Sequence, residues 1–258
     1  MKKRFWQFRA AAEAGVGELL IYGPISDVTW YGDEVTPAQF REDLQALGDV
    51  DEIRVYINSP GGDVFAGQTI HSMLARHPAT ITVYVDGLAA SAASLIAMAG
   101  DVVIMPKNAM MMVHNPSALV WGEAEDMRHM ADALDKIRDS MVAAYRAKTG
   151  LDDEQIIELL DAETWMTAEE AVELGFADKV AEAKRVAASI RGDKALVNGV
   201  ELDLSRYRNA EKARAILRAS QSRQANEDDV SATGALFGAP VGLYERRVRV
   251  NERRWVKW

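Results

Sequence analysis

Three short stretches of the sequence carry residues that can do chemistry. The first, INSPGG at residues 57–62, ends an apolar run with a proline and two glycines. Successive glycines can adopt positive φ and let the backbone approach a ligand closely, so this loop can aim its N–H groups at a bound group. In the second, Ser91 stands between an apolar run and an alanine-rich segment. The third, MMMVHNP at residues 110–116, places His114 where an apolar run gives way to a loop.

Ser91 and His114 have the residue types of a nucleophile and its base. A serine hydroxyl is a weak nucleophile until a neighbouring base takes its proton, and neutral histidine is the most frequent such base. The start of a helix also offers free N–H groups and the positive end of its dipole, which stabilise a developing oxyanion. A serine at a helix start also serves as a cap or a packing residue, and a histidine at a strand end is also found in structural roles. The residue types alone leave both roles open.

Strands and helices alternate along the chain and would position these residues. We expect strands at residues 18–26, 52–59, 80–87, 101–106 and 109–116. We expect helices at residues 36–47, 64–77 and 88–100. Near-continuous apolar strands that alternate with helices are typical of a largely parallel sheet covered by helices. The predicted fold class is therefore α/β, a class that builds its sites at the carboxyl ends of strands, where His114 falls.

The longest periodic segment runs from Glu123 to Gly150 and predicts one helix. Its apolar residues recur every three or four positions, at Met127, Met130, Leu134, Ile137, Met141 and Tyr145. Such a stripe packs in the core of its own domain or, where the helix overhangs that domain, against another subunit. At a rise of about 1.5 Å per residue the helix is roughly 40 Å long. Self-association is therefore one of two alternatives for this stripe.

Composition limits the class of protein and its surroundings. The 258 residues include no cysteine, which excludes disulfides, thiolate metal sites and a cysteine nucleophile. The net charge of −9 argues against nucleic-acid binding. No apolar run approaches the length of a membrane span, and Arg9 and Glu13 interrupt the stretch that a secretory signal would need. We expect a cytoplasmic protein without a nucleic-acid or membrane partner.

Charge also divides the chain along its length. Residues 205–258 hold twelve Lys and Arg against six Asp and Glu, a balance of +6, so the preceding residues carry −15. Part of this segment is polar, punctuated by Gly and Pro, and without periodicity, which is typical of disorder. We expect an N-terminal segment at residues 1–17, a main domain at residues 18–185, and a basic, partly disordered C-terminal extension at residues 186–258.

Four motifs, taken in order, resemble those of the Clp protease proteolytic subunit family, and in particular its phage-type members, the head maturation proteases. They are INSPGG at 57–62, GLAAS at 87–91, MVHNP at 112–116 and EAVELGFAD at 170–178. The resemblance covers residues 18–182 and implies a ClpP/crotonase-like α/β fold of repeated β-β-α units. It also implies a serine endopeptidase that uses no metal or cofactor, and it makes the long helix a protruding handle that interlocks two rings.

The resemblance assigns roles to individual residues. It makes Ser91 the nucleophile and His114 the general base, which takes the serine proton and later protonates the leaving amine. It makes the N–H of Gly62 and the N–H of Ala92, the residue after the nucleophile, an oxyanion hole. The glycine loop would therefore hold the negatively charged oxygen of the reaction.

The acid that orients the histidine is where this sequence departs from the family pattern. The family aspartate falls on Glu163, and Asp161 lies two residues earlier as a rival. Some hydrolases use a glutamate beside a serine and a histidine. Because glutamate is longer than aspartate, its backbone must then lie about one methylene further from the histidine. We expect Glu163 to be the acid and keep Asp161 as the alternative.

The resemblance also predicts the partners of the protein. Substrates would be proteins or peptides, with capsid and scaffold proteins as candidates, and the chain would form a homo-oligomeric ring. The chain lacks the long N-terminal segment at which housekeeping Clp peptidases dock their AAA+ unfoldase, so we expect an activity that depends on ATP weakly or not at all. We also expect that removal of residues 206–258 leaves cleavage of short peptides intact.

Two functions from other classes stay open. Crotonase-type enzymes share the superfamily and hold a thioester enolate with two backbone N–H groups, without a serine and histidine pair. A catalytically silent assembly protein would only organise subunits. The coincidence of Ser91 and His114 argues against the first function, and reaction with a serine reagent would exclude the second.

Overall fold

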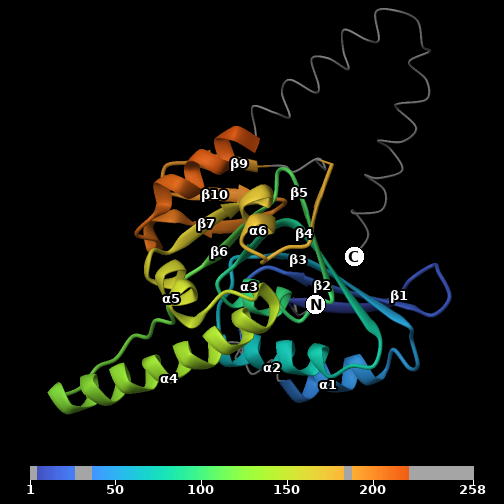
Figure 1. Cartoon of the computed structure of the whole chain (residues 1–258), viewed down its shortest axis with the longest axis horizontal. Coiled ribbons are helices and arrows are strands. Elements are labelled where there is room, and N and C mark those ends of the chain that lie inside the picture. Colours follow the sequence, from blue (N-terminus) through green and yellow to red (C-terminus); the bar gives the residue numbers. More distant parts are fainter. Residues whose placement is uncertain (1–4, 27–36, 183–187, 221–258) are drawn as a thin grey trace, which may run out of the picture. The chain divides into compact units, whose positions relative to one another are not determined.

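The structure is a computed structural model that describes residues 5–26, 37–182 and 188–220 (Figure 1). The chain divides into a compact unit that ends at Ser220 and a second unit at residues 221–258. The predicted disorder in the basic C-terminal extension falls mostly on residues 221–258 and therefore lies outside the described residues. None of the described helices has the length and apolar character that a membrane crossing needs.

A mixed sheet of eight strands forms the centre of the first unit. Its strand order is β1-β2-β3-β4-β5-β8, with β6 paired to β4 and β7 paired to β6. The bounds are β1 Trp6–Ala10, β2 Val16–Tyr22, β3 Glu52–Ser59, β4 Thr80–Ala90, β5 Val102–Pro106, β6 Met110–Val113, β7 Thr164–Thr167 and β8 Lys179–Ala181. Only β1 and β7 run antiparallel to their neighbours in this sheet as described. The predicted α/β class is confirmed.

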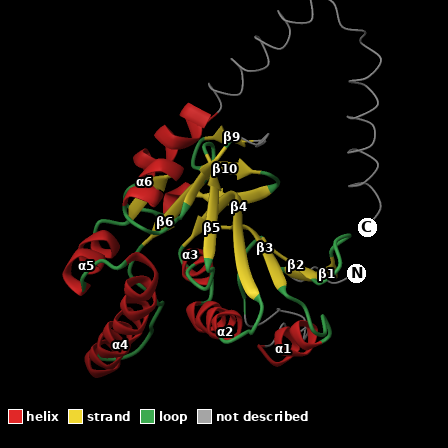
Figure 2. Ribbon diagram, turned by 45° about the vertical axis from the view of Figure 1, so that its right-hand side comes forward, coloured by secondary structure: helices red, strands yellow, loops and turns green. Residues whose placement is uncertain are grey.

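Helices cover the apolar face of this sheet, as the alternation of the sequence predicts. They are α1 Pro37–Gln45, α2 Val64–Ala75, α3 Ala92–Ala97, α4 Ala124–Thr149, α5 Asp153–Asp161 and α6 Ala168–Glu173. In β3, Ile53, Val55 and Ile57 alternate with more exposed residues and are fully buried. They join one hydrophobic cluster with Phe40 of α1 and Leu74 of α2. Figure 2 shows α1 and α2 together on one side of the strands.

The small-residue segment after Gly87 divides between a strand and a helix, whereas the sequence predicted one helix over residues 88–100. Leu88–Ala90 continue β4 and pair with Met110–Met112 of β6, and α3 begins only at Ala92. Pairing with β6 satisfies the backbone groups of these residues, and the side chains of Leu88 and Ala90 are fully buried. Ser91 therefore lies at the junction of the strand and the helix.

Helix α4 forms where the apolar stripe predicts it, and its two halves differ in burial. Met141 and Tyr145 in the C-terminal half are buried, whereas Met127 near the start is 45% exposed. Met130 and Leu134, which lie between them, are only partly buried. Figure 1 shows this N-terminal half of α4 extending away from the sheet. The first half of the stripe is therefore not covered by the described residues of its own chain.

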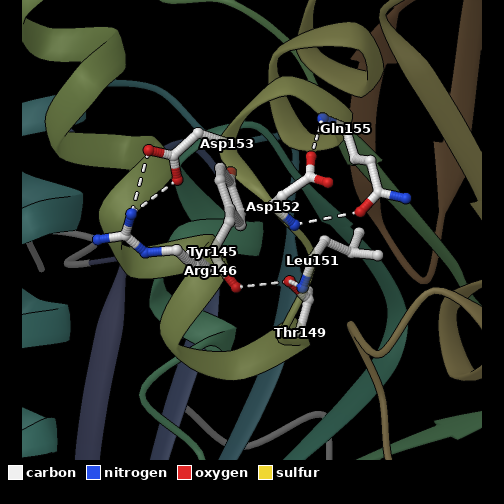
Figure 3. A network of polar contacts seen from close by, with 7 residues as sticks. All are labelled: Tyr145, Arg146, Thr149, Leu151, Asp152, Asp153 and Gln155. Atoms are coloured by element: carbon white, nitrogen blue, oxygen red, sulfur yellow. Dashed lines mark hydrogen bonds and ion pairs between the residues drawn. The ribbon is translucent and has the colours of Figure 1, made fainter.

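The turn from α4 into α5 is held by polar contacts (Figure 3). Arg146 donates to both carboxylate oxygens of Asp153, at 2.8 and 3.0 Å. Asp152 accepts the N–H of Gln155, and the Gln155 side chain accepts the N–H of Asp152, which forms a capping box at the start of α5. These contacts fix the direction of α5, which leads directly to Glu163.

Residues 188–220 pack on the main sheet. They form an antiparallel sheet of β9 Ala188–Arg191, β10 Lys194–Val197 and β11 Val200–Asp203, then a 3₁₀ turn at Leu204–Arg206 and a helix at residues 210–220. Their apolar side chains share a second cluster with Met112 and Trp165 of the main sheet. The side-chain amide of Asn58 donates to the carbonyl of Val197 at 3.0 Å. The compact unit thus continues beyond residue 185, the expected end of the main domain.

The other expected boundary lies at residue 17. Strand β1 falls within the segment predicted at residues 1–17 and pairs with β2 along its whole length, from Trp6 opposite Ile21 to Ala10 opposite Gly17. Trp6 is buried, and its ring nitrogen donates to Asp43 at 2.9 Å. Residues 6–10 of that segment are therefore an edge strand of the main sheet.

Candidate active site

Ser91 occupies a strained turn between β4 and α3. Its φ of 56° and ψ of −127° are rare for a residue with a side chain and cost on the order of 1–3 kcal/mol. Neighbouring groups hold this conformation: the Ser91 N–H donates to the carbonyl of Met112 at 2.9 Å, and the Ser91 carbonyl accepts the Ser94 hydroxyl at 2.7 Å. The turn presents the Ser91 side chain at the end of the strand.

His114 follows β6, the strand that pairs in parallel with the end of β4. The carboxyl ends of two neighbouring parallel strands meet at one edge of a sheet, so residues just beyond them lie close together. The Nε2 of His114 lies 2.8 Å from the Oγ of Ser91. With its proton on Nδ1, the imidazole can accept the serine hydroxyl proton at Nε2. The structure thus brings together the two residues that the sequence picked out as nucleophile and base.

The surroundings of His114 favour its neutral form. Burial is the largest influence and lowers the pKa of the imidazole below its ordinary value. The Glu163 carboxylate acts in the opposite direction and raises this pKa, whereas the Arg208 guanidinium lowers it. Since the net effect is a lowered pKa, His114 stays neutral, and able to accept a proton, at a lower pH than an exposed histidine.

We expect kcat/KM for a peptide substrate to rise with pH through an apparent pKa below the ordinary histidine value of about 6.5. The base must be neutral to act, so activity is lost as pH falls through the pKa of His114 in the free enzyme. A lowered pKa moves this part of the pH profile, its acid limb, to lower pH. Initial rates at low substrate concentration in a series of acidic to neutral buffers measure the limb. A limb above the ordinary histidine value would contradict the dominant effect of burial on the pKa of His114.

The glycine loop lies directly against the nucleophile. A Cβ on Gly61 would be 2.5 Å from the carbonyl oxygen of Ala90 and 2.6 Å from the Cβ of Ser91. A Cβ on Gly62, whose φ is 148°, would be 1.9 Å from the carbonyl oxygen of Ile25. No side chain fits at either position without a backbone shift. The close approach that the sequence predicted for this loop is therefore present, and its partner is the Ser91 turn.

Two backbone N–H groups near Ser91 are oriented away from secondary-structure partners. Ile25 donates to the carbonyl of Gly61 and accepts the N–H of Asp63, in a parallel bridge centred on Gly62. Because N–H groups alternate in direction along an extended chain, the N–H of Gly62 points away from Ile25. Ala92 is the first residue of α3, where an N–H has no acceptor within the helix. Both residues expected in the oxyanion hole thus have N–H groups that are free of these pairings.

Glu163 is buried, with 4% of its surface exposed, and its φ is 48°. Its Oε1 accepts the N–H of Asn209 at 2.9 Å and its Oε2 accepts the N–H of Arg208 at 3.2 Å. Among the residues that the structure describes, no hydrogen bond joins this carboxylate to His114. Its charge nevertheless raises the pKa of His114. Glu163 therefore acts on the histidine through space, and its hydrogen bonds go to the C-terminal segment.

Asp161, the alternative acid, has a different environment. It is an exposed residue, and its Oδ1 accepts the side-chain amide of Asn115 at 2.6 Å. The influences on the pKa of His114 include the charges of Glu163 and Arg208 but not that of Asp161. A buried charge interacts more strongly with its neighbours than an exposed one, because less water screens it. Of the two carboxylates, Glu163 therefore has the stronger electrostatic influence on His114.

A cleft of about 790 Å³ runs along Ser91 and His114. One part of its lining is apolar and comes from the stripe of α4, at Met130, Leu134, Ile137 and Met141. Another part comes from the C-terminal segment, at Lys194, Glu201, Leu202, Asp203, Arg206 and Tyr207. A groove of this size, with an apolar side and a polar side, can hold several residues of an extended chain.

None of these C-terminal residues is predicted from the sequence to belong to the site. The shift toward basic charge after residue 204 and the loss of periodicity suggested an appendage. A local signal was present, because Asn198-Gly199 stands between short alternating runs and is typical of a two-residue hairpin turn. The structure has this hairpin, with Val197 paired to Val200.

Comparisons with known proteins bear on the identity of this chain. A family model described as "Clp protease" matches residues 38–184, which include Ser91, His114 and Glu163. The chain is also similar to a protein of Deinococcus radiodurans described as "ATP-dependent Clp protease proteolytic subunit". The two are 34% identical over 137 residues, which cover 52% of this chain and 67% of the relative.

Proposed function

The chain belongs to the Clp protease family, a family of peptidases. We propose that it is a serine endopeptidase in which Ser91 attacks the peptide carbonyl. The observation that carries the proposal is the distance of 2.8 Å between Ser91 Oγ and His114 Nε2. The pair lines a cleft that is large enough for an extended peptide. Burial, by lowering the pKa of His114, keeps the base neutral and ready to act.

The proposed reaction follows from the positions of these groups. As Ser91 Oγ bonds to the carbonyl carbon, its proton passes to His114 Nε2. The carbonyl oxygen becomes negatively charged, and the N–H groups of Gly62 and Ala92 stabilise it in the oxyanion hole. His114 then gives the proton to the leaving amine, which leaves an acyl ester on Ser91. Water, activated by the same histidine, releases the acid and restores the serine.

Labelling with a fluorophosphonate, followed by peptide mass spectrometry, tests this proposal. The reagent reacts with serines that a neighbouring base activates, so we expect a single adduct on the peptide that contains Ser91. The same label should be lost in His114→Ala. Peptide hydrolysis without an adduct on Ser91, or hydration of a thioester without labelling, would refute the proposed mechanism. The second of these results would favour the crotonase-type chemistry.

We expect Glu163→Gln to lower kcat by roughly 10- to 1,000-fold, less than the loss of nucleophile or base, because an orienting acid usually contributes less. The same change removes the negative charge that raises the pKa of His114, so the acid limb of kcat/KM should also move to lower pH. Asp161→Asn is the matched control and should leave both the rate and the limb unchanged. Reversed results for the two variants would make Asp161 the acid.

We also infer that the protein assembles into a homo-oligomeric ring, with α4 as the handle of the contact. The support is the uncovered first half of its stripe, where Met127 is 45% exposed and Met130 and Leu134 are partly buried. A ring would enclose the serine site and restrict it to protein or peptide substrates that enter. By resemblance to phage-type members, we propose capsid or scaffold proteins as substrates. We also propose that the protein acts in the cytoplasm and requires no unfoldase. Light scattering on the intact chain measures the assembly.

A further inference from the structure

Three consecutive residues of the C-terminal segment surround the acid of the site. We call residues 207–209 the clamp. The N–H groups of Arg208 and Asn209 each donate to one carboxylate oxygen of Glu163, at 3.2 and 2.9 Å. The side-chain amide of Asn209 donates to the main-chain carbonyl of Glu163 at 3.3 Å. The guanidinium of Arg208 donates to the carbonyl of Asp161 at 3.2 Å. The clamp thus holds both the carboxylate and the backbone around it.

The first residue of the clamp contacts the base. The centre of the Tyr207 ring lies 6.3 Å from that of His114 and 5.2 Å from that of Trp165, which is 1% exposed. Tyr207 also lines the cleft beside His114. Aromatic rings at these separations are in packing contact, so Tyr207 covers one side of the imidazole and contributes to its burial. Within the clamp, Arg208 and Asn209 therefore contact the acid, and Tyr207 contacts the base.

The clamp is itself anchored on both sides. Before it, Leu204 is buried in the second hydrophobic cluster. After it, the helix at residues 210–220 places Ile216 and Leu217 in the same cluster, and Lys212 pairs with Glu170 at 2.7 Å. Because its two flanks are packed on the main sheet, the clamp can hold Glu163 at a fixed position.

We propose that the clamp positions the Glu163 carboxylate for catalysis, so that a segment outside the peptidase motifs completes the active site. The inference rests on the proposed function. During the reaction His114 becomes positively charged, and a fixed negative charge beside it stabilises that state without any rearrangement. Glu163 has no hydrogen bond to His114 among the described residues, so its position depends on the bonds from Arg208 and Asn209. These two are positioning residues, since they act through Glu163.

The first test is Asn209→Ala, with Asn198→Ala as its matched control. Both variants lose a side-chain amide that donates to a main-chain carbonyl, that of Glu163 for Asn209 and that of Asp86 for Asn198. A small displacement of a catalytic group costs up to about 100-fold in rate, so we expect kcat to fall by roughly tenfold or more in Asn209→Ala with KM little changed. Asn198→Ala should keep its kcat, whatever its melting temperature. Equal kcat values in the two variants would overturn the proposal.

The second test removes the charge of Arg208 and keeps the backbone N–H groups of the clamp. Ser91 and Tyr207 contact His114, and the charges of Glu163 and Arg208 act on it. The charge of Arg208 lowers the pKa of His114. Arg208→Gln should therefore move the acid limb of kcat/KM to higher pH, opposite to the shift expected for Glu163→Gln. Arg214→Gln is the control, because Arg214 pairs with Asp193 and its charge is not among those that shift the pKa of His114. A purely structural role of Arg208 would lower the melting temperature and leave the limb in place, which would count against the clamp.

Two truncations separate this inference from the proposed function. Removal of residues 221–258 keeps the clamp and should preserve peptide cleavage. Removal of residues 206–258 deletes the clamp and also the helix that places Ile216 and Leu217 in the second cluster, so we expect kcat to fall at least tenfold. The second expectation replaces the one drawn from the sequence, because Glu163 is now seen to bind residues 208 and 209. Full activity after the longer deletion would refute the clamp alone, provided that Ser91→Ala is inactive. Activity in Ser91→Ala would refute the proposed function itself.

Discussion

Replacing Ser91 with alanine is expected to lower kcat for peptide hydrolysis by at least about a thousandfold. In the proposed mechanism this oxygen forms the acyl ester, so the variant has no covalent route. Only binding in the cleft and the N–H groups of Gly62 and Ala92 remain to accelerate direct attack by water. KM for a short peptide should change little, because the removed hydroxyl contributes mainly to the chemical step.

The fold of the variant should survive this change. The strained Ser91 backbone is held by the N–H bond to Met112 and by the Ser94 hydroxyl on its carbonyl, and neither contact uses the Ser91 side chain. Ser140→Ala is the matched control, since Ser140 is an exposed serine of α4 that bonds Gln68. It should retain wild-type kcat and still take up the fluorophosphonate. Unchanged turnover in a folded Ser91→Ala protein would refute the serine peptidase proposal.

The resemblance predicted the pairing of Ser91 with His114, and the parallel strands account for it. Ser91 and His114 each follow an apolar run, and the carboxyl ends of neighbouring parallel strands meet at one edge of a sheet. Their pairing required only that β4 and β6 be adjacent, which they are. The glycine loop was predictable for a similar reason, because only glycine tolerates the close approach that is seen at Gly61 and Gly62.

The environment of the acid could not be predicted from local patterns. Glu163 binds residues 45 and 46 positions further along the chain, and no periodicity in the sequence links segments so far apart. The end of β4 was also assigned to the wrong element, because alanine favours helices and Leu88–Ala90 look helical without their partner strand. Pairing with β6 outweighs that preference. Both differences come from tertiary contacts that a local reading of the sequence does not include.

The second large effect is expected for His114→Ala, and its significance lies in combination with Ser91→Ala. The single variant should lose about as much kcat as Ser91→Ala, because without the base the serine hydroxyl stays protonated and unreactive. In the proposed mechanism the proton moves along the hydrogen bond of 2.8 Å between the two side chains, so each residue needs the other. The double variant should therefore be little slower than either single one.

This combination distinguishes a working pair from two residues that are merely close. If Ser91 and His114 acted independently, the increases in activation free energy caused by the two substitutions would add, and the fold-losses in kcat would multiply. If they act as a unit, the first substitution already removes the whole covalent route, and the second has nothing left to remove. Measuring kcat for the wild type, both single variants and the double variant gives the coupling directly. A multiplicative loss would show that the proton of Ser91 does not pass to His114, and the reaction would then need a different base.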